Sequence, residues 1–354
     1  MTTIRKATVC SIIPPCSIIP PHMLEEIAKR GKPHQRDWAL HNLAVAGFVR
    51  GRRYTLGFFP SAAPVGQKNR NIYDNKNQGG EPPTGTLVRK EGDPASGDAA
   101  VDEAYDGTGA TYDLYFDIYK RNSIDDKGMP LISYVHYDVN FDNAFWDGSE
   151  MVYGDGDPDI FERFTKAIDV TGHELTHGVT QYEANLAYSN QPGALNESMS
   201  DVFGSLVKQR VLNQTADQAD WIIGAGLFKP TINGVGIRSM KAPGTAYDDP
   251  LLGKDPQPAH MKDYVKTSRD NGGVHINSGI PNHAFYLAAA EIGGYAWEKA
   301  GNIWYIALRD YLRSKSNFKK AATTTISVAK ELYGEGSKEQ KAVQNAWKAV
   351  GVLS

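Results

Sequence analysis

The sequence predicts an α+β fold in two lobes, a β-rich lobe followed by an α-helical lobe. Residues 54–157 are rich in Gly, Asp, Asn and short aromatic or β-branched runs, which are typical of strands and turns. From about Phe161 onward, apolar residues recur with helical spacing. The 354-residue length also exceeds what one simple core usually needs. We therefore expect two lobes with a cleft between them.

The first 53 residues are expected to form a small separate unit. Residues 10–21 contain Cys-Ser-Ile-Ile-Pro-Pro twice, and each proline pair favours extended backbone. A helix is predicted over residues 23–30, ended by the glycine and proline that follow it. A second helix is predicted over residues 35–45.

The rest of the chain is divided into a β-rich lobe over residues 54–190 and a helical lobe over residues 191–354. In the first lobe residues 131–137 form the clearest strand, and residues 99–119 the clearest helix. Further helices are predicted over residues 161–182, 193–210, 280–292, 300–312, 318–332 and 337–350.

Composition excludes several functional classes. The net charge of −3 and the pI near 6.3 give no electrostatic basis for binding nucleic acid. No apolar run approaches the ~20 residues that span a bilayer, so we expect no membrane insertion. The N-terminus lacks a conventional signal peptide, which leaves a cytoplasmic location or secretion by another route. We expect a monomer.

The most informative stretch is His-Glu-Leu-Thr-His, from His173 to His177. At ~100° per residue, histidines four positions apart share one helical face, so their imidazoles can meet one metal ion. Glu174 projects from the same turn, and Glu197 follows as a candidate third ligand. Two imidazoles and one carboxylate around Zn²⁺ leave a fourth position for water, as in a catalytic zinc site. The alternative is a surface helix that merely carries these residue types.

Four other segments accompany this motif. They are Asn-Ala-Phe-Trp-Asp-Gly from Asn143, an isolated Tyr188, Arg-Ser-Met from Arg238, and Asp-Asn-Gly-Gly-Val-His from Asp270. With His-Glu-Leu-Thr-His and the Asn-Glu-Ser-Met-Ser-Asp around Glu197, the set resembles the thermolysin family of zinc metallopeptidases. The resemblance covers nearly all of the chain beyond the N-terminal unit. It implies an endopeptidase with one catalytic Zn²⁺, acting on proteins and peptides.

The resemblance also assigns roles around the metal. Glu174 would be the general base that takes the proton of the attacking water. Tyr188 and His275 would donate hydrogen bonds to the oxyanion, with Asp270 holding the imidazole. Asp201, one helical turn after the third ligand, would accept a hydrogen bond from a ligand histidine.

Substrate contacts follow from the same resemblance. Asn143 and the backbone of Ala144 would bind the substrate main chain along an edge strand. Arg238 would hydrogen-bond the carbonyl just past the cleaved bond. An apolar pocket for the residue after that bond predicts cleavage before large hydrophobic residues. The matching positions are Phe161, Phe164, Val170, Leu227 and Ile237.

The N-terminal unit resembles the short inhibitory prosegment of protealysin-type members of the family, so the precursor would be latent. The segment expected to lie extended in the cleft is Pro20, Pro21, His22 and Met23. Its removal, by self-cleavage, is expected within about residues 48–66. An open alternative is that Cys10, Cys16 or His22 ligates zinc in the latent form. The duplicated hexapeptide departs from the single copy expected.

Calcium is the other departure from the family pattern. Asp169 and Asp220 match two calcium-ligand positions, but Lys208, Ile222 and Ala225 stand where carboxylates would be expected. Because Ca²⁺ needs 6–8 oxygen ligands, we expect no structural calcium, or at most weak binding.

Two rival functions remain. One is a catalytically idle relative that binds peptides or a partner protein, which the presence of Glu174, Tyr188 and His275 argues against. The other is a zinc amidohydrolase acting on side-chain amides, which Asn143 and Arg238 disfavour because they suit an extended peptide.

Overall fold

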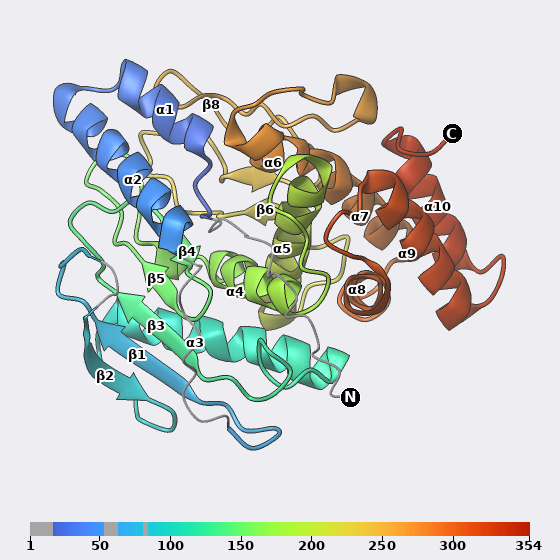
Figure 1. Cartoon of the computed structure of the whole chain (residues 1–354), viewed down its shortest axis with the longest axis horizontal. Helices are drawn as coiled ribbons and strands as arrows, with labels where there is room; N and C mark the ends of the chain where they lie inside the picture. The colour runs from blue at the N-terminus through green and yellow to red at the C-terminus, as the bar shows by residue number, and fades with distance from the viewer. Residues whose placement is uncertain (1–16, 53–62, 81–83) are drawn as a thin grey trace, which may run out of the picture.

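Two long helices cross the middle of the molecule and carry the predicted metal ligands. They are α4 (Ile168–Tyr182) and α5 (Asn190–Val211), which pack side by side at the centre of Figure 1. Gly204 allows this close packing, because a Cβ there would collide with the backbone of Asp169 and His173. The two helices therefore approach almost backbone to backbone.

The computed structural model describes residues 17–52, 63–80 and 84–354. The first hexapeptide copy, Cys10, Cys16 and most of the predicted cleavage window lie outside these ranges. Among the described residues, no helix is both long enough and apolar enough to cross a membrane.

The first lobe contains a five-stranded sheet with strand order β2-β1-β3-β5-β4. The strands are β1 (Arg70–Asp74), β2 (Thr86–Lys90), β3 (Leu131–Val135), β4 (Ala144–Trp146) and β5 (Met151–Tyr153). β1, β3 and β5 run parallel, while β2 and β4 are antiparallel to their neighbours. Helix α3 (Ala99–Asp113) packs between this sheet and α4. β4 is therefore an edge strand beside the zinc-motif helix.

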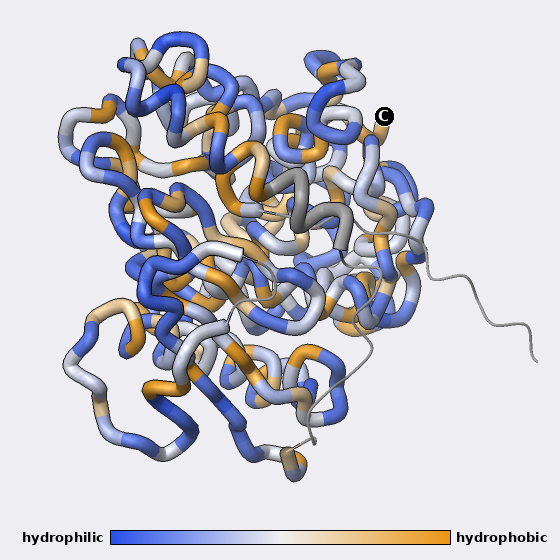
Figure 2. Tube along the Cα trace, turned by 60° about the vertical axis from the view of Figure 1, so that its left-hand side comes forward, coloured by the Kyte–Doolittle hydropathy of each residue, from blue (hydrophilic) through white to orange (hydrophobic). Residues whose placement is uncertain are grey.

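The second lobe is mostly helical, as predicted. Beyond α5 its helices are α6 (Asp270–Asn277), α7 (Gly279–Ile292), α8 (Ala300–Ile306), α9 (Phe318–Tyr333) and α10 (Lys338–Ala349). Two short hairpins precede them, β6 (Ile222–Ile223) with β7 (Arg238–Ser239), and β8 (Asp248–Asp249) with β9 (Gly253–Lys254). The hydrophobic stretches gather in the interior and the outer loops are largely hydrophilic (Figure 2).

The N-terminal unit is a pair of helices, α1 (Pro21–Arg30) and α2 (Pro33–Arg52), that lies against the catalytic lobes (Figure 1). Both helices begin at proline, which is favoured at the first helical position because its fixed φ suits the helix. α1 buries Met23, Leu24 and Ile27. Polar pairs hold α2, with His34 2.8 Å from Asp159 and His41 2.7 Å from Asp138.

The mixed fold with a sheet-containing first lobe and a helical second lobe confirms the predicted class. Some boundaries differ. The predicted helix 161–182 begins only at Ile168, because Phe161 pairs with Phe228 in a β-bridge and Phe164–Lys166 form a 3-10 turn, η2. The predicted helices over residues 99–119 and 300–312 each end in a π-helical segment, η1 (Leu114–Ile118) and η4 (Ala307–Tyr311). Met261–Asp263 form a further 3-10 turn, η3.

Candidate metal centre and substrate cleft

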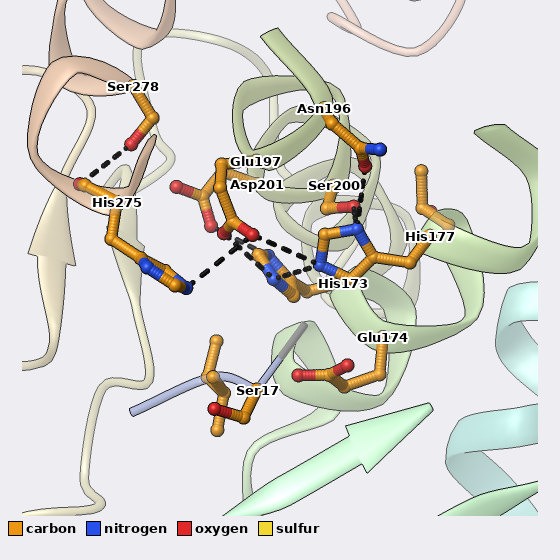
Figure 3. A network of polar contacts seen from close by, with 12 residues as sticks. Ser17, His173, Glu174, His177, Asn196, Glu197, Ser200, Asp201, His275 and Ser278 are labelled. Carbon is orange, nitrogen blue, oxygen red and sulfur yellow. Dashed lines mark hydrogen bonds and ion pairs between the residues drawn. The ribbon is translucent and has the colours of Figure 1, made fainter. Parts of the chain in front are cut away.

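Three predicted metal ligands meet at one point between α4 and α5. One ligand atom from each of His173, His177 and Glu197 lies within 4.8 Å of the others, and all three side chains are buried. The two histidine Nε2 atoms are 3.0 Å apart. They lie 3.5 Å and 3.6 Å from the oxygens of Glu197. Figure 3 shows these residues gathered in one cluster.

Neighbouring side chains orient both imidazoles. His173 Nδ1 lies 2.8 Å from Asp201 Oδ1. His177 Nδ1 lies 2.8 Å from Asn196 Oδ1 and 3.0 Å from Ser200 Oγ. Because a metal-binding histidine usually donates its other N–H to such a partner, both Nε2 atoms are left as donors to a metal.

This donor set fits a zinc ion. If both Nε2 atoms carried a proton, their N–H groups would repel each other at 3.0 Å. Without these protons, both atoms can direct a lone pair at one cation. Glu197 Oε2 is buried and has no hydrogen-bond partner among the described residues. Such an atom is costly unless a cation joins it. Two imidazoles and one carboxylate are also the donor types of catalytic zinc.

Glu174 stands beside this cluster on the first turn of the motif. Its side chain is fully buried, and its Oε2 accepts a hydrogen bond from Trp146 N at 3.1 Å. Because Trp146 ends β4, the edge strand of the sheet fixes the carboxylate that was predicted to be the general base.

Tyr188 and His275 approach the cluster from the other side. The Tyr188 hydroxyl lies 3.1 Å from His275 Nε2 and donates a hydrogen bond to Glu197. His275 Nδ1 lies 2.6 Å from Asp270 Oδ1, and His275 N donates to Asp270 Oδ2 at 2.9 Å. Burial opposes a charge on His275, but the nearby carboxylates of Asp270 and Glu197 raise its pKa above the usual range.

The chain turn that presents His275 has unusual backbone angles. Asp270, Asn271, Gly272 and Gly273 all have positive φ, at 51°, 50°, 88° and 76°. Two of the four are glycines, for which this region costs little. The turn brings the carboxylate of Asp270 back to the backbone N–H and the ring of His275.

Asp201 links the metal cluster to Arg238. The guanidinium donates to both Asp201 oxygens at 2.8 Å, and Asn282 Nδ2 donates to Oδ2 at 2.8 Å. Burial alone would raise the pKa of Asp201, but the charge of Arg238 and the contact with His173 lower it well below its usual range. A charged, fully hydrogen-bonded carboxylate therefore holds Arg238 beside the metal ligands.

The chain's own N-terminal segment occupies the predicted substrate contacts. Ile18 N donates to Ala144 O at 3.2 Å, and Ile19 N donates to Asn143 Oδ1 at 3.0 Å. Arg238 Nη1 donates to Ile18 O at 3.1 Å. The three positions predicted to bind the substrate main chain therefore all contact one extended segment.

This placement corrects the predicted position of the cleft-binding stretch. Pro20 is extended, but Pro21, His22 and Met23 form the first turn of α1, because proline is preorganised for a helix start. His22 Nε2 lies 3.2 Å from Tyr247 OH, and the metal cluster found among the described residues contains no prosegment side chain. The hydrogen bonds to Asn143, Ala144 and Arg238 come from Ile18 and Ile19, a few residues earlier, while Pro21 and His22 line a pocket together with Asp270.

The predicted pocket residues are all buried, and all belong to the large hydrophobic core cluster of the molecule. Membership of this core does not distinguish a substrate pocket from ordinary packing. The rings of Phe161 and Phe164 lie 5.8 Å apart. Leu227 and Ile237 flank Gly224, where an added Cβ would approach both side chains. Val170 is buried in the first turn of α4. Their service as a substrate pocket stays a prediction.

Sequence reasoning missed several residues of the site. Asn196 and Ser200 hold His177, and Asn282 holds Asp201. A signal existed for the first two, since they lie four residues apart on the helix that carries Glu197. Asn282 and the segment Ser17–Ile19 come from distant parts of the chain and gave no such signal.

The predicted calcium region contains a lysine ion pair. Lys208 Nζ lies 3.0 Å from Asp169 Oδ2 and 2.9 Å from Asp220 Oδ1, and it donates to Ile222 O at 2.5 Å. Burial would lower the pKa of Lys208, but the two carboxylates outweigh it and raise the pKa above the usual value. A protonated amine thus lies between the two aspartates.

Comparison with known proteins matches two adjoining family descriptions. The catalytic domain of thermolysin metallopeptidase matches residues 64–181, and its alpha-helical domain matches residues 184–352. An "Extracellular metalloprotease" of Pectobacterium carotovorum is 52% identical over 96% of this chain and 97% of its own length. "Protease PrtS" of a Photorhabdus strain is 49% identical over 95% of this chain and 91% of its own.

A solved structure, the precursor of protealysin, a metalloproteinase from Serratia proteamaculans, is also similar. It is 55% identical with a TM-score of 0.87, and the match covers 96% of this chain and 100% of that one.

Proposed function

The chain belongs to the thermolysin family of zinc metallopeptidases, and on that premise we propose that it is the latent precursor of a neutral endopeptidase. Membership makes it a hydrolase of peptide bonds, as predicted. One observation carries the more specific proposal. The ligand cluster, Glu174 and the two oxyanion donors surround a cleft in which the chain's own extended segment makes the predicted substrate contacts.

In the proposed reaction, zinc held by His173, His177 and Glu197 would polarise the carbonyl and acidify a water molecule. Glu174 accepts the proton of the attacking water and passes it to the leaving amine. Its anchorage by Trp146 N supports this role, because the carboxylate is held beside the cluster before substrate binds. Tyr188 and His275 donate hydrogen bonds to the developing oxyanion.

Substrates would bind as an extra strand on β4. Asn143, Ala144 and Arg238 contact the main chain, so they select an extended peptide without selecting its sequence. Selectivity would come from the apolar side chains near Phe161 and Leu227, which favour a large hydrophobic residue after the cleaved bond. Peptides that differ only at that position test this, and equal cleavage before Leu and before Asp would contradict it.

The N-terminal unit would keep the precursor inactive until it is removed. Its extended segment fills the cleft, and α1 and α2 dock it through buried apolar residues and polar pairs. We place removal, by self-cleavage, within about residues 48–66. The name of the Pectobacterium relative, "Extracellular metalloprotease", supports an extracellular destination for the mature protein. Finding the processed protein in culture supernatant would test that.

We also propose that structural calcium is absent near α4, because Lys208 already supplies the positive charge. Added Ca²⁺ should leave the melting temperature of the wild-type protein unchanged. In Lys208→Glu, three carboxylates would face one another, so Ca²⁺ should raise its melting temperature by several degrees. A strong upward shift for the wild type would contradict the proposal.

The central test uses purified protein and casein, with and without a zinc chelator. We expect cleavage that the chelator abolishes and that Glu174→Ala lacks, because the general base is gone. Mass spectrometry of the same sample locates the mature N-terminus. If casein stays intact in every sample after the N-terminal unit is removed, the protein is an idle peptide binder instead.

A further inference from the structure

His275 is held at its backbone as well as at its ring. Asp270 Oδ1, 2.6 Å from Nδ1, fixes the plane of the imidazole. The carbonyl oxygen of His275 lies in the last turn of α6, where carbonyl groups have no partner within the helix. Two side chains donate to it instead, Gln257 Nε2 at 2.8 Å and Ser278 Oγ at 2.9 Å, the second of which Figure 3 shows.

Helix α6 by itself gives this histidine little support. It has eight residues, and Asn271, Gly272 and Gly273 within it have left-handed backbone angles, with φ of 50°, 88° and 76°. The remainder makes about one regular turn. A helical stretch this short is marginal without tertiary contacts. The position of the imidazole therefore depends on the side chains that hold the turn from outside.

Gln257 can act as such a support because its own position is fixed. The residue is buried, and a Cβ added at Gly279 would lie only 3.0 Å from its Cβ, so the side chain packs against the start of α7. Its backbone N–H donates to Asp255 Oδ1 at 3.0 Å. Asp255 also accepts hydrogen bonds from two other backbone N–H groups, both at 3.1 Å. Gln257 therefore connects a well-anchored loop to the backbone of His275.

The ring that this backbone carries faces the metal-ligand cluster. His275 Nε2 lies 3.1 Å from the Tyr188 hydroxyl and 3.5 Å from Glu197 Oε1. Donors to an oxyanion act at about 2.7–3.1 Å, so a backbone shift of about 1 Å would take the imidazole out of range.

We propose that Gln257 is a positioning residue for His275: its amide N–H fixes the backbone from which the imidazole reaches the developing oxyanion. The inference rests on the proposed peptidase function and adds a residue to its mechanism. The oxyanion forms only when water attacks the carbonyl, so a displaced His275 weakens transition-state binding and leaves substrate binding unchanged. Replacing Gln257 should therefore lower kcat without raising KM.

Gln209 on α5 supplies a matched control. It is also buried, and its Nε2 donates to a serine, Ser205 Oγ, at 2.9 Å. The amide oxygens of both glutamines are buried without a hydrogen-bond partner in the part of the chain that the structure describes. The two differ in that only the Gln257 amide also donates to a residue of the site. Methionine at either position nearly keeps the volume and removes the donor.

The test compares the two methionine variants in their mature form. Each precursor is matured on beads that carry the wild-type enzyme, the beads are removed, and mass spectrometry verifies the new N-terminus. An internally quenched peptide with leucine after the cleaved bond then gives kcat and KM. Gln257→Met should lower kcat by about tenfold, a part of the 10²–10³-fold loss expected when an oxyanion donor is deleted. Its KM, and both constants of Gln209→Met, should stay within about twofold of wild type.

The coupling to the imidazole is measured in a His275→Ala background. There Gln257→Met should change kcat by less than about twofold, because the group that it positions is gone. Gln257→Asn, whose amide is one methylene shorter, should give an intermediate kcat and guards against misfolding of the methionine variant. Melting temperatures of the variants measure the structural contribution of each glutamine separately.

Three results would overturn the proposal: a wild-type kcat in both Gln257 variants, a rise in KM in place of the fall in kcat, or a tenfold loss that persists without His275. In each of these cases the wild-type protein still cuts the peptide, and the peptidase function stands. If the wild-type protein cuts neither casein nor the peptide, the proposed function fails and this inference fails with it.

Discussion

The helix pair α4 and α5 contains two cation sites that are built differently. At one, His173, His177 and Glu197 converge and leave a buried carboxylate oxygen without a hydrogen bond among the described residues. At the other, Asp169 is joined by the amine of Lys208, about two turns further along α5 than the last metal neighbour, Asp201. The same pair of helices thus leaves one place for a metal ion and fills the other with its own side chain.

The difference shows what a buried carboxylate requires. An ionised carboxylate away from water needs a counter-charge, and either a metal or an ammonium group can supply it. A metal ion can be removed, and when bound it can leave a coordination position open for water. A lysine is a permanent part of the chain and offers no such position. We therefore expect the catalytic function to depend on the first site and the stability of the fold to depend on the second.

The largest effect should come from removing a ligand of the first site. Glu197→Gln should lower peptidase activity by roughly three orders of magnitude, because a neutral amide is a poor ligand for Zn²⁺. Metal analysis should show loss of zinc from the purified variant. Glu298→Gln, an exposed change of the same chemistry, should keep both zinc and activity. A Glu197→Gln protein that retains zinc would contradict the ligand assignment.

Removing the lysine should act on stability instead. Lys208→Met should lower the free energy of unfolding by about 3 kcal/mol, because Asp169 is left buried without a counter-charge. Denaturant titration measures this, with exposed Lys319→Met as the control. Zinc content should not change. A loss of zinc comparable to that of Glu197→Gln would mean that the two sites are not separate.

An intermediate effect is expected from changing Asp201, which contacts both a metal ligand and a buried arginine. Asp201 orients the ligand His173 and also binds Arg238. Asp201→Asn should weaken zinc binding by about 10–100-fold, the usual result when a partner of a ligand histidine is changed. Competition with a chelating dye measures this affinity. An unchanged zinc affinity would show that Asp201 serves only Arg238.

The parts of the site that could be predicted are those fixed by local geometry. His173 and His177 meet because four residues make about one turn, and Asp201 follows Glu197 by the same spacing. The resemblance supplied the distant partners Tyr188 and His275, which no local rule connects.

What escaped prediction depends on tertiary contacts. The residue that enters the cleft is set by where α1 starts and by which strand lies at the sheet edge. Nothing in Pro20 and Pro21 themselves shows that the helix begins there and shifts the extended segment back to Ser17–Ile19. The left-handed turn from Asp270 to Gly273 was also missed, because two glycines in a row permit several conformations.

The smallest effect concerns a third site, where two carboxylates share a counter-charge that can titrate. His136 Nδ1 lies 2.8 Å from Asp155 Oδ2 and its Nε2 lies 3.1 Å from Asp98 Oδ2. The hydrogen bond and charge of Asp155, aided by Asp98, raise the pKa of His136 from 6.5 to about 9. Because the folded state binds this proton more tightly, the contribution to stability is complete below about pH 6.5. It is lost as the pH rises through about 9.

His136→Gln should therefore lower the free energy of unfolding by roughly 1 kcal/mol at pH 6, since solvent screens this partly exposed group. At pH 10 the variant and the wild type should be equally stable in the same denaturant titration. Lys208→Met provides the contrast, because lysine stays charged over most of this range and its effect should persist at both pH values. A pH-independent loss in His136→Gln would show that the imidazole acts by packing and not by charge. The His136 site would then no longer be comparable with the metal-ligand cluster and the Lys208 site, where a positive charge offsets buried carboxylates.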